Sequence, residues 1–143
     1  MGRAIWDALD APARESALAR VRHLIDAPTD WPWDWPKQLK GTERAECAAA
    51  LLVEADEAQL QRNLYGVTEP RLRLKDTARG FAGYERPGEL TGSAVLAHAT
   101  AIEPYAQALV AQARAEGLAY VELRGSPHKY RPTDPASFLC ELR

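Results

Sequence analysis

The stretch Gly117–His128 constrains the fold of this 143-residue chain more than any other part. It follows an alanine-rich segment with helical spacing, and Gly117 stands where such a helix should end. Residues 118–123 then alternate in the pattern of a β-strand, and the turn-forming residues 125–127 end that pattern. A helix that runs into a strand is half of an α/β crossover unit. We therefore expect a mostly α fold with one principal strand at 118–123.

One face of this predicted strand carries two opposite charges. Tyr120, Glu122 and Arg124 share that face, whereas Val121 and Leu123 lie on the other. Central strands of parallel sheets are usually apolar on both faces, because both faces are covered. Buried charges there must pair or accept hydrogen bonds, since an unpaired buried ion costs several kcal/mol. The two charges either hold a sheet in register or orient active-site groups from behind.

The carboxyl end of a strand is where ligands gather in α/β folds. Glu122, Arg124, Ser126 and His128 are our candidate site residues at that end. Ser126 and His128 lie beyond the strand and are better placed to touch a ligand. Neither has a general base or a metal-ligand partner at recognisable spacing. The sequence therefore predicts no catalytic residue and no metal ligand in this chain.

A family resemblance enters at the same residues. The run Glu116-Gly-Leu-Ala-Tyr-Val-Glu-Leu-Arg-Gly-Ser-Pro-His128 resembles the second barrel strand of the adenosine deaminase family, whose pattern is Gly-Val-x-Tyr-x-Glu-x-Arg-x-Ser-Pro. The resemblance extends over residues 77–130. It implies a partial α/β segment derived from a TIM barrel. It also implies, for the complete family member, hydrolytic deamination of a purine nucleoside or nucleotide by a zinc-activated water. Phe81 and Tyr84 fall where that family closes a lid over the substrate.

The family's zinc ligands have no counterpart here. They include a His-x-His pair, whereas the histidines of this chain, His23, His98 and His128, stand far apart. A complete eight-stranded barrel needs about 250 residues, so 143 residues provide no complete barrel. The resemblance is therefore to an N-terminal portion that ends after the second strand. We expect no cofactor in this chain and zinc in the complete family member.

Charge and hydropathy exclude several classes of function. The chain has 18 basic and 20 acidic residues, a formal net charge of −2, which favours neither nucleic acid nor anionic membranes. It has no run of 18 apolar residues and no signal-peptide pattern. Cys47 and Cys140 lack metal-ligand spacing and suit reduced thiols. We expect a cytoplasmic protein that binds neither nucleic acid nor membranes.

Four segments divide the chain. Residues 1–40 are predicted to form a helical arm that ends in a tryptophan–proline segment, and residues 41–66 a long alanine-rich helix capped by Thr42. Residues 67–92 contain the lid-like loop, and residues 93–143 the helix–strand unit. The helix of that unit carries an apolar stripe, which comprises Ile102, Tyr105, Ala106, Leu109, Val110 and Ala113.

The tryptophan–proline segment contains Trp31, Trp33 and Trp35, which alternate with Pro32 and Asp34. Proline favours extended geometry in the residue before it, so we expect an extended segment. Three indoles this close together bury a large apolar area. They form either a surface for a partner protein or base, or a strap over the chain's own core.

Two functions from different classes fit these observations. The first is the N-terminal portion of an adenosine-deaminase-like enzyme, not catalytic alone. The tryptophan segment and the long helix suggest a larger branch, such as the deaminase-like component of bacterial RADAR antiviral systems. The alternative is a non-enzymatic helical scaffold or interaction module. A lone strand leaves both edges unpaired, so we expect self-association or binding to a downstream deaminase polypeptide.

Overall fold

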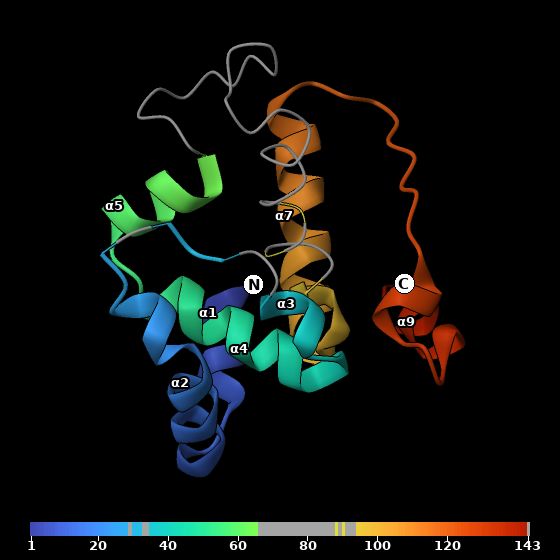
Figure 1. Ribbon diagram of the computed structural model, residues 1–143. Helices are drawn as coiled ribbons and strands as arrows, with labels where there is room; N and C mark the ends of the chain where they lie inside the picture. Colours follow the sequence, from blue (N-terminus) through green and yellow to red (C-terminus); the bar gives the residue numbers. More distant parts are fainter. Residues whose placement is uncertain (29, 33–34, 66–87, 89, 91–93, 143) are drawn as a thin grey trace.

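The computed structural model describes residues 1–28, 30–32, 35–65, 88, 90 and 94–142 (Figure 1). Regular structure in this part is helical, which confirms the mostly α prediction. The α-helices are α1 (Gly2–Ala8), α2 (Ala11–Ile25), α3 (Trp35–Gln38), α4 (Gly41–Glu54), α5 (Glu57–Leu60), α7 (Ile102–Ala115), α8 (Pro127–Tyr130) and α9 (Pro135–Leu142). A π-helical turn, η1 (Gln61–Tyr65), follows α5. Two 3-10 turns, η4 (Val95–Ala97) and η5 (Ala99–Ala101), precede α7. No described helix is long and apolar enough to cross a membrane.

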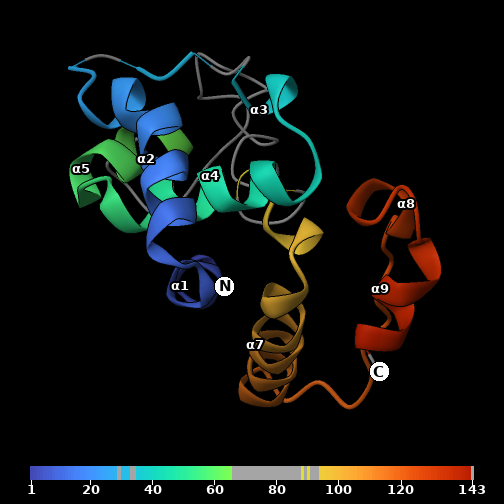
Figure 2. The ribbon, with the colours of Figure 1, turned by 90° about the horizontal axis from the view of Figure 1, so that it is seen from below.

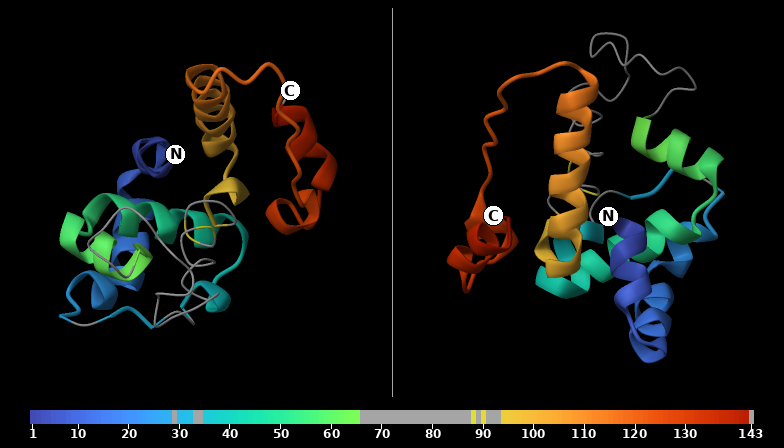
Figure 3. Two further views of the ribbon diagram at one scale, coloured as in Figure 1. Left: turned by 90° about the horizontal axis from the view of Figure 1, so that it is seen from above. Right: turned by 180° about the vertical axis from the view of Figure 1, so that it is seen from behind.

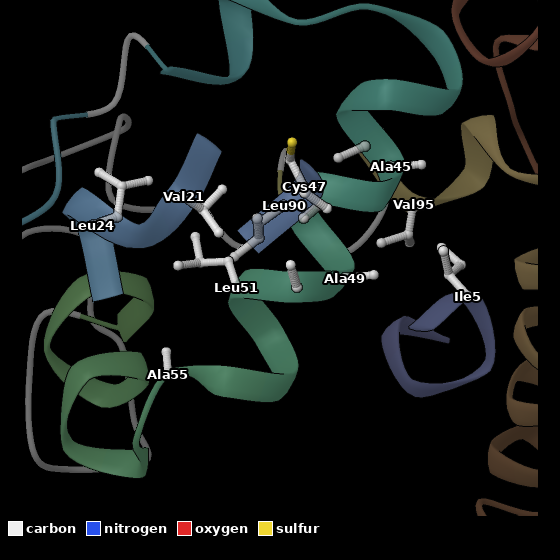
Figure 4. Packing of buried hydrophobic residues seen from close by; sticks show 14 of the residues in the cluster. Ile5, Val21, Leu24, Ala45, Cys47, Ala49, Leu51, Ala55, Leu90 and Val95 are labelled. Atoms are coloured by element: carbon white, nitrogen blue, oxygen red, sulfur yellow. The ribbon is translucent and has the colours of Figure 1, made fainter. Parts of the chain in front are cut away.

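Helix α4 lies at the centre of the N-terminal core. It packs against α2, α1 and η4, and side chains from these elements converge on it in Figure 4. The alanines at 48–50 are fully buried, and their small side chains allow close approach of the neighbouring helices. Gly2 marks the closest approach of α1, because a Cβ there would lie 3.2 Å from Cδ1 of Leu52. We call this assembly of α1, α2, α4, Leu90 and Val95 the N-terminal core.

Side chains at the junction between α1 and α2 bind backbone groups at the end of α1 and the start of α2. Asp10 begins α2, where its carboxylate accepts a hydrogen bond of 2.9 Å from the amide of Ala13. Arg14 donates from Nε to the carbonyl oxygen of Trp6 at 2.9 Å. Its guanidinium also lies 5.5 Å from the centroid of the Trp6 ring. Arg14 thus satisfies a carbonyl at the end of α1 while it covers a largely buried indole.

The helix predicted over residues 41–66 is interrupted. Helix α4 begins at Gly41, after an N-cap at Lys40 rather than Thr42, and ends at Glu54. Ala55 is extended, and Asp56 starts α5 with a capping box. Its carboxylate accepts from the Gln59 amide at 2.7 Å, and Oε1 of Gln59 accepts from the Asp56 amide at 3.1 Å. These bonds satisfy the start of a new helix, so the alanine-rich sequence breaks there.

Helix α7 ends as predicted at the glycine. Gly117 has φ of 69°, in the left-handed region that glycine tolerates. The amide of Leu118 donates to the carbonyl of Ala113 at 2.9 Å, and that of Gly117 to Arg114 at 3.1 Å. These two bonds form a Schellman motif, which satisfies the last carbonyls of the helix.

The predicted strand does not follow. Residues 118–126, which we call the connector, form neither helix nor strand. Figure 1 shows the connector running from the far end of α7 back to α8. Leu118, Tyr120, Val121 and Leu123 are exposed there. Alternation of side chains favours an extended backbone, but a strand also requires a neighbour for its hydrogen bonds. The described residues provide none. The TIM-barrel-derived unit inferred for 93–143 is likewise not formed in this part of the chain.

Helices α8 and α9 pack near the first turns of α7. Leu96, Ile102 and Phe138 form a small buried cluster with Tyr105, Tyr130 and Leu142 around it. Helix α8 begins at a proline that follows the connector, and α9 begins at Pro135. In Figures 2 and 3, α7 lies between the N-terminal helices on one side and α8–α9 on the other. We call α7, the connector, α8 and α9 the C-terminal arm.

Candidate functional site

A cavity of about 490 Å³ opens where the connector meets the C-terminal helices. Its lining comes from η4, α7, the end of the connector, α8 and α9. The lining residues are Leu96, Tyr105, Leu123, Arg124, Gly125, Pro127, Tyr130, Phe138, Leu139 and Leu142. The volume lies in the range of small-molecule sites, which are typically about 300–1,000 Å³. The predicted strand end therefore borders a real hollow, although the strand itself is absent from the described residues.

Arg124 and Glu122 pair with each other. Nε of Arg124 lies 3.0 Å from Oε1 of Glu122, as expected for side chains two positions apart on one side of an extended chain. The relative exposure of the two side chains is 90% and 58%. The sequence predicted that they face the interior, and this is wrong in the described structure because no sheet or helix covers the connector. An ion pair this exposed adds little to stability.

The structure does not place Ser126 and His128 in one site with the Glu122–Arg124 pair. Ser126 is half-buried and precedes α8, where its carbonyl accepts from the Lys129 amide at 2.8 Å. His128 is exposed on α8. Of the four predicted side chains, Arg124 lines the cavity. The site is an apolar cavity with the Arg124 guanidinium at its edge. The four predicted side chains form no pair of a nucleophile and a base.

Aromatic rings dominate one wall of the cavity. The rings of Tyr130 and Phe138 have centroids 4.8 Å apart and are tilted by 41°. Arg131 holds this wall against η4, since Nη1 donates to the carbonyl of Leu96 at 2.8 Å. Its Nη2 also lies 2.9 Å from Oε2 of Glu141. Arg131 was not singled out from the sequence, and no spacing pattern marks a contact across 35 residues.

The described tryptophans belong to the core. Trp31 is 2% exposed and Trp35 is 6% exposed, which is the arrangement of the strap alternative. Nε1 of Trp31 donates to the carbonyl of Leu24 at 3.0 Å. Trp35 lines a second hollow of about 350 Å³ together with Arg20 and His23. Trp33 lies outside the described residues, as do the lid candidates Phe81 and Tyr84.

Asn63 is a buried polar group that sequence reasoning missed. It is 0% exposed, and its Oδ1 accepts from the backbone amide of Trp31 at 2.7 Å. Its Nδ2 donates to the carbonyl of Gln59 at 2.9 Å, and Nε2 of Gln59 donates to the carbonyl of Ile25. Asn63 and Gln59 thus fasten the Trp31 segment and the end of α2 to α5 and η1. The Asp56-x-x-Gln59 capping pattern was the available signal for part of this arrangement.

Two titratable groups in or beside the N-terminal core have shifted pKa values. Burial raises the pKa of the Cys47 thiol to about 11; the Arg20 guanidinium opposes this shift, and Glu43 and Glu46 add to it. Burial lowers the pKa of His98, Glu46 opposes this effect and Arg131 adds to it. A buried thiol with a raised pKa is a poor nucleophile at neutral pH. Cys47 is therefore a packing residue.

The zinc implied by the family resemblance does not fit the described part of this chain. Residues 1–28, 30–32, 35–65 and 94–142 contain no group of three or more His, Cys, Asp or Glu side chains able to hold a metal ion. His98 instead begins η5, where Nδ1 accepts from the Thr100 amide at 3.3 Å. No protein-family model matches the chain, and comparisons with curated proteins and with solved structures found no match.

Proposed function

We propose that this chain is the N-terminal portion of an adenosine-deaminase-like enzyme of the kind that deaminates purine nucleosides or nucleotides. In this proposal the chain supplies scaffold rather than catalytic groups. The observation that carries it is the connector. The Glu122-Leu-Arg-Gly-Ser-Pro motif of the resemblance lies in the connector and the first residue of α8, yet residues 118–125 are exposed and their backbone is without a neighbouring strand among the described residues.

One side of the connector is apolar, as a strand that packs within a sheet requires. Val121 is 45% exposed and Leu123 is 50% exposed, so adjacent strands would remove apolar area from water. On α7, Leu109 is half-buried and Val110 is 49% exposed, which leaves part of the apolar stripe available to cover such a sheet. Strands supplied by a second polypeptide would bury both surfaces together. The proposed branch is the larger RADAR-type deaminase component, and the zinc site would come entirely from outside the described residues.

A complementation experiment tests this proposal. The chain is co-expressed with the polypeptide encoded directly downstream, and co-purification and deamination of adenosine are measured. We expect complex formation, with activity that depends on the second polypeptide. Val121→Asp should weaken complex formation because it places a charge in the new sheet, whereas the matched change Ala111→Asp, at an exposed position of α7 outside the apolar stripe, should not. Deamination of adenosine by the chain alone would contradict the proposal.

A non-enzymatic helical scaffold is the second candidate, and the N-terminal core favours it. Residues 47–51 of α4 are at most 1% exposed, so this part buries its centre without help from another chain. The same co-expression distinguishes the two functions. A scaffold would bind partners through a surface other than the connector, and Val121→Asp would leave that binding unchanged.

A further inference from the structure

The connector presents a free hydrogen-bonding edge. Within the described structure, the backbone amides and carbonyls of residues 119–125 form no hydrogen bond with another residue. The amide of Leu118 is still bonded to α7, and the carbonyl of Ser126 is bonded to α8, so the free edge is bounded on both sides. Exposed segments with unpaired backbone groups are templates for pairing with another chain. What remains to be decided is which chain fits.

We propose that the connector pairs antiparallel with the connector of a second copy, about a twofold axis that passes beside Leu123. In this register Leu123 faces its own counterpart, Glu122 faces Arg124 of the other copy, and Tyr120 faces Ser126. The contact is isologous, which is the commonest form of dimer symmetry. This inference goes beyond the proposed function and does not rest on it, because it concerns the chain by itself.

Charge selects this register among the alternatives. An axis at Leu123 forms two opposite-charge pairs, Glu122 with Arg124 and Arg124 with Glu122. An axis at Glu122 or at Arg124 would instead place like charges opposite each other, which is unfavourable. An axis at Val121 would leave Glu122 opposite Tyr120. The 3.0 Å contact between Glu122 and Arg124 within one copy already places both charges on the same side of the connector.

The apolar residues suit the same geometry. Val121 and Leu123 share the opposite side of an extended chain, and both are about half exposed in the single chain. Leu123 also lines the 490 Å³ cavity, so the twofold axis lies beside an apolar hollow on each copy. A two-stranded ribbon is marginally stable by itself. We therefore expect a weak dimer whose population rises with protein concentration.

Charge reversal is the first test. The Glu122→Arg variant carries two positive charges in the connector, and the Arg124→Glu variant carries two negative charges. Each change converts two favourable pairs into two unfavourable ones, so each variant alone should dimerise about tenfold more weakly than the natural sequence. An equimolar mixture should form heterodimers, and the double variant with both changes should recover dimerisation. Sedimentation velocity over a concentration series measures all four samples.

Disulfide trapping is the second test, and it reads the register directly. Leu123→Cys is made in a Cys140→Ser background, because Cys140 is exposed and Cys47 is buried. Residues opposite each other on a twofold axis lie within disulfide range, so covalent dimers should form under mild oxidation. In the matched control, Val121→Cys, the two thiols lie opposite Gly125 and are separated by about 13 Å. That variant should form no covalent dimers in the same time.

Three results would overturn the inference. These are a natural chain that stays monomeric at all concentrations, charge-reversal variants that dimerise as well as the natural sequence, or equal crosslinking at positions 121 and 123. The outcome is separable from that of the proposed function. A chain that never dimerises but binds the downstream polypeptide through its connector refutes this inference alone. A chain that forms the register-specific dimer but binds no such polypeptide refutes the proposed function alone.

Discussion

Helices α4 and α7 are both 14 residues long and both rich in alanine, yet they have opposite environments. Helix α4 buries six residues, whereas α7 buries one, Ile102. The difference arises from the neighbours. Helix α4 has α1, α2 and η4 packed around it, while α7 packs against η5 and α9, chiefly through Ile102 and Tyr105 in its first turns. Helical sequence alone therefore does not determine which helix becomes the core.

This contrast divides the molecule into two parts. The N-terminal core buries its apolar side chains, whereas the C-terminal arm leaves many of its own exposed. The N-terminal core satisfies several of its backbone groups with its own caps and with Asn63, while Nε1 of Trp35 and Nε of Arg44 are buried without a hydrogen-bond partner among the described residues. The C-terminal arm keeps an apolar stripe and an unpaired connector in contact with solvent. Both the complementation proposal and the dimer place the missing contacts at the arm and none in the core. Substitutions in the two regions should therefore differ in the size of their effect on the free energy of unfolding.

The largest expected loss of stability comes from the centre of α4. Leu51→Ala removes a side chain that is 0% exposed and leaves a cavity, so the free energy of unfolding should fall by about 2–5 kcal/mol. On α7, Val110→Ala should change it by no more than about 0.5 kcal/mol, because Val110 is 49% exposed. Urea unfolding followed by circular dichroism measures both. Equal losses at the two positions would contradict the division between core and arm.

A smaller loss is expected at Asn63. Asn63→Ala removes the acceptor of the buried Trp31 amide, and an unsatisfied buried donor costs about 1–3 kcal/mol. Tryptophan fluorescence during urea unfolding should report the loss, since Trp31 is fastened at this point. Gln107→Ala, which removes an exposed side-chain bond to Glu103 on α7, is the matched control and should be nearly neutral. A neutral Asn63→Ala would mean that other contacts, such as the bond from Nε1 of Trp31 to the Leu24 carbonyl, hold the Trp31 segment.

A substitution at the end of α7 should lower stability less than Asn63→Ala does. Gly117→Ala places a Cβ at φ of 69°, which costs about 1 kcal/mol in the left-handed region. The amide of Leu118, bonded to Ala113 in the Schellman motif, should then exchange its hydrogen about fivefold faster. In the control Gly125→Ala the new Cβ would lie 3.8 Å from Tyr130, an ordinary contact, and that amide should be unaffected. Unchanged exchange in Gly117→Ala would show that α7 ends by some other means.

Local signals in the sequence predicted the parts of the fold that local interactions determine. Gly117 ends α7 because its left-handed conformation depends on the residue itself and on the preceding turn. The start of α2 is likewise determined locally, by the Asp10 cap and a proline in the first turn. For the tryptophan segment the sequence left two alternatives open, and the described indoles are in the arrangement of the strap. The sequence did not say which surface they would cover.

The features that were not predicted correctly from the sequence share a physical cause. Alternation at 118–123 predicts a side-chain arrangement, but whether a strand forms depends on a partner strand, which need not belong to the same chain. The break at Ala55 was overlooked because alanine content outweighed the capping pattern of Asp56 and Gln59. Asn63 and Arg131 act through contacts 32 and 35 residues away, which no periodicity encodes. Of the predicted site residues, Arg124 lines the cavity; the exposure of Arg124 and Glu122 and the cavity itself were not predicted.

The smallest expected effect lies at His98, where the two regions meet. Its pKa is lowered, chiefly by burial, so the unfolded chain binds a proton more readily than the folded chain. The stability that this group contributes is present above pH 6.5 and is lost as the pH falls below that value. His98→Asn keeps an acceptor for the Thr100 amide without a titrating ring. It should therefore flatten the fall in unfolding free energy between pH 7 and pH 5, as measured by urea unfolding at several pH values. His128→Asn removes an exposed imidazole and leaves His98 in place, so it should keep the fall. An identical decline in His98→Asn and the natural sequence would mean that acid sensitivity arises away from this junction.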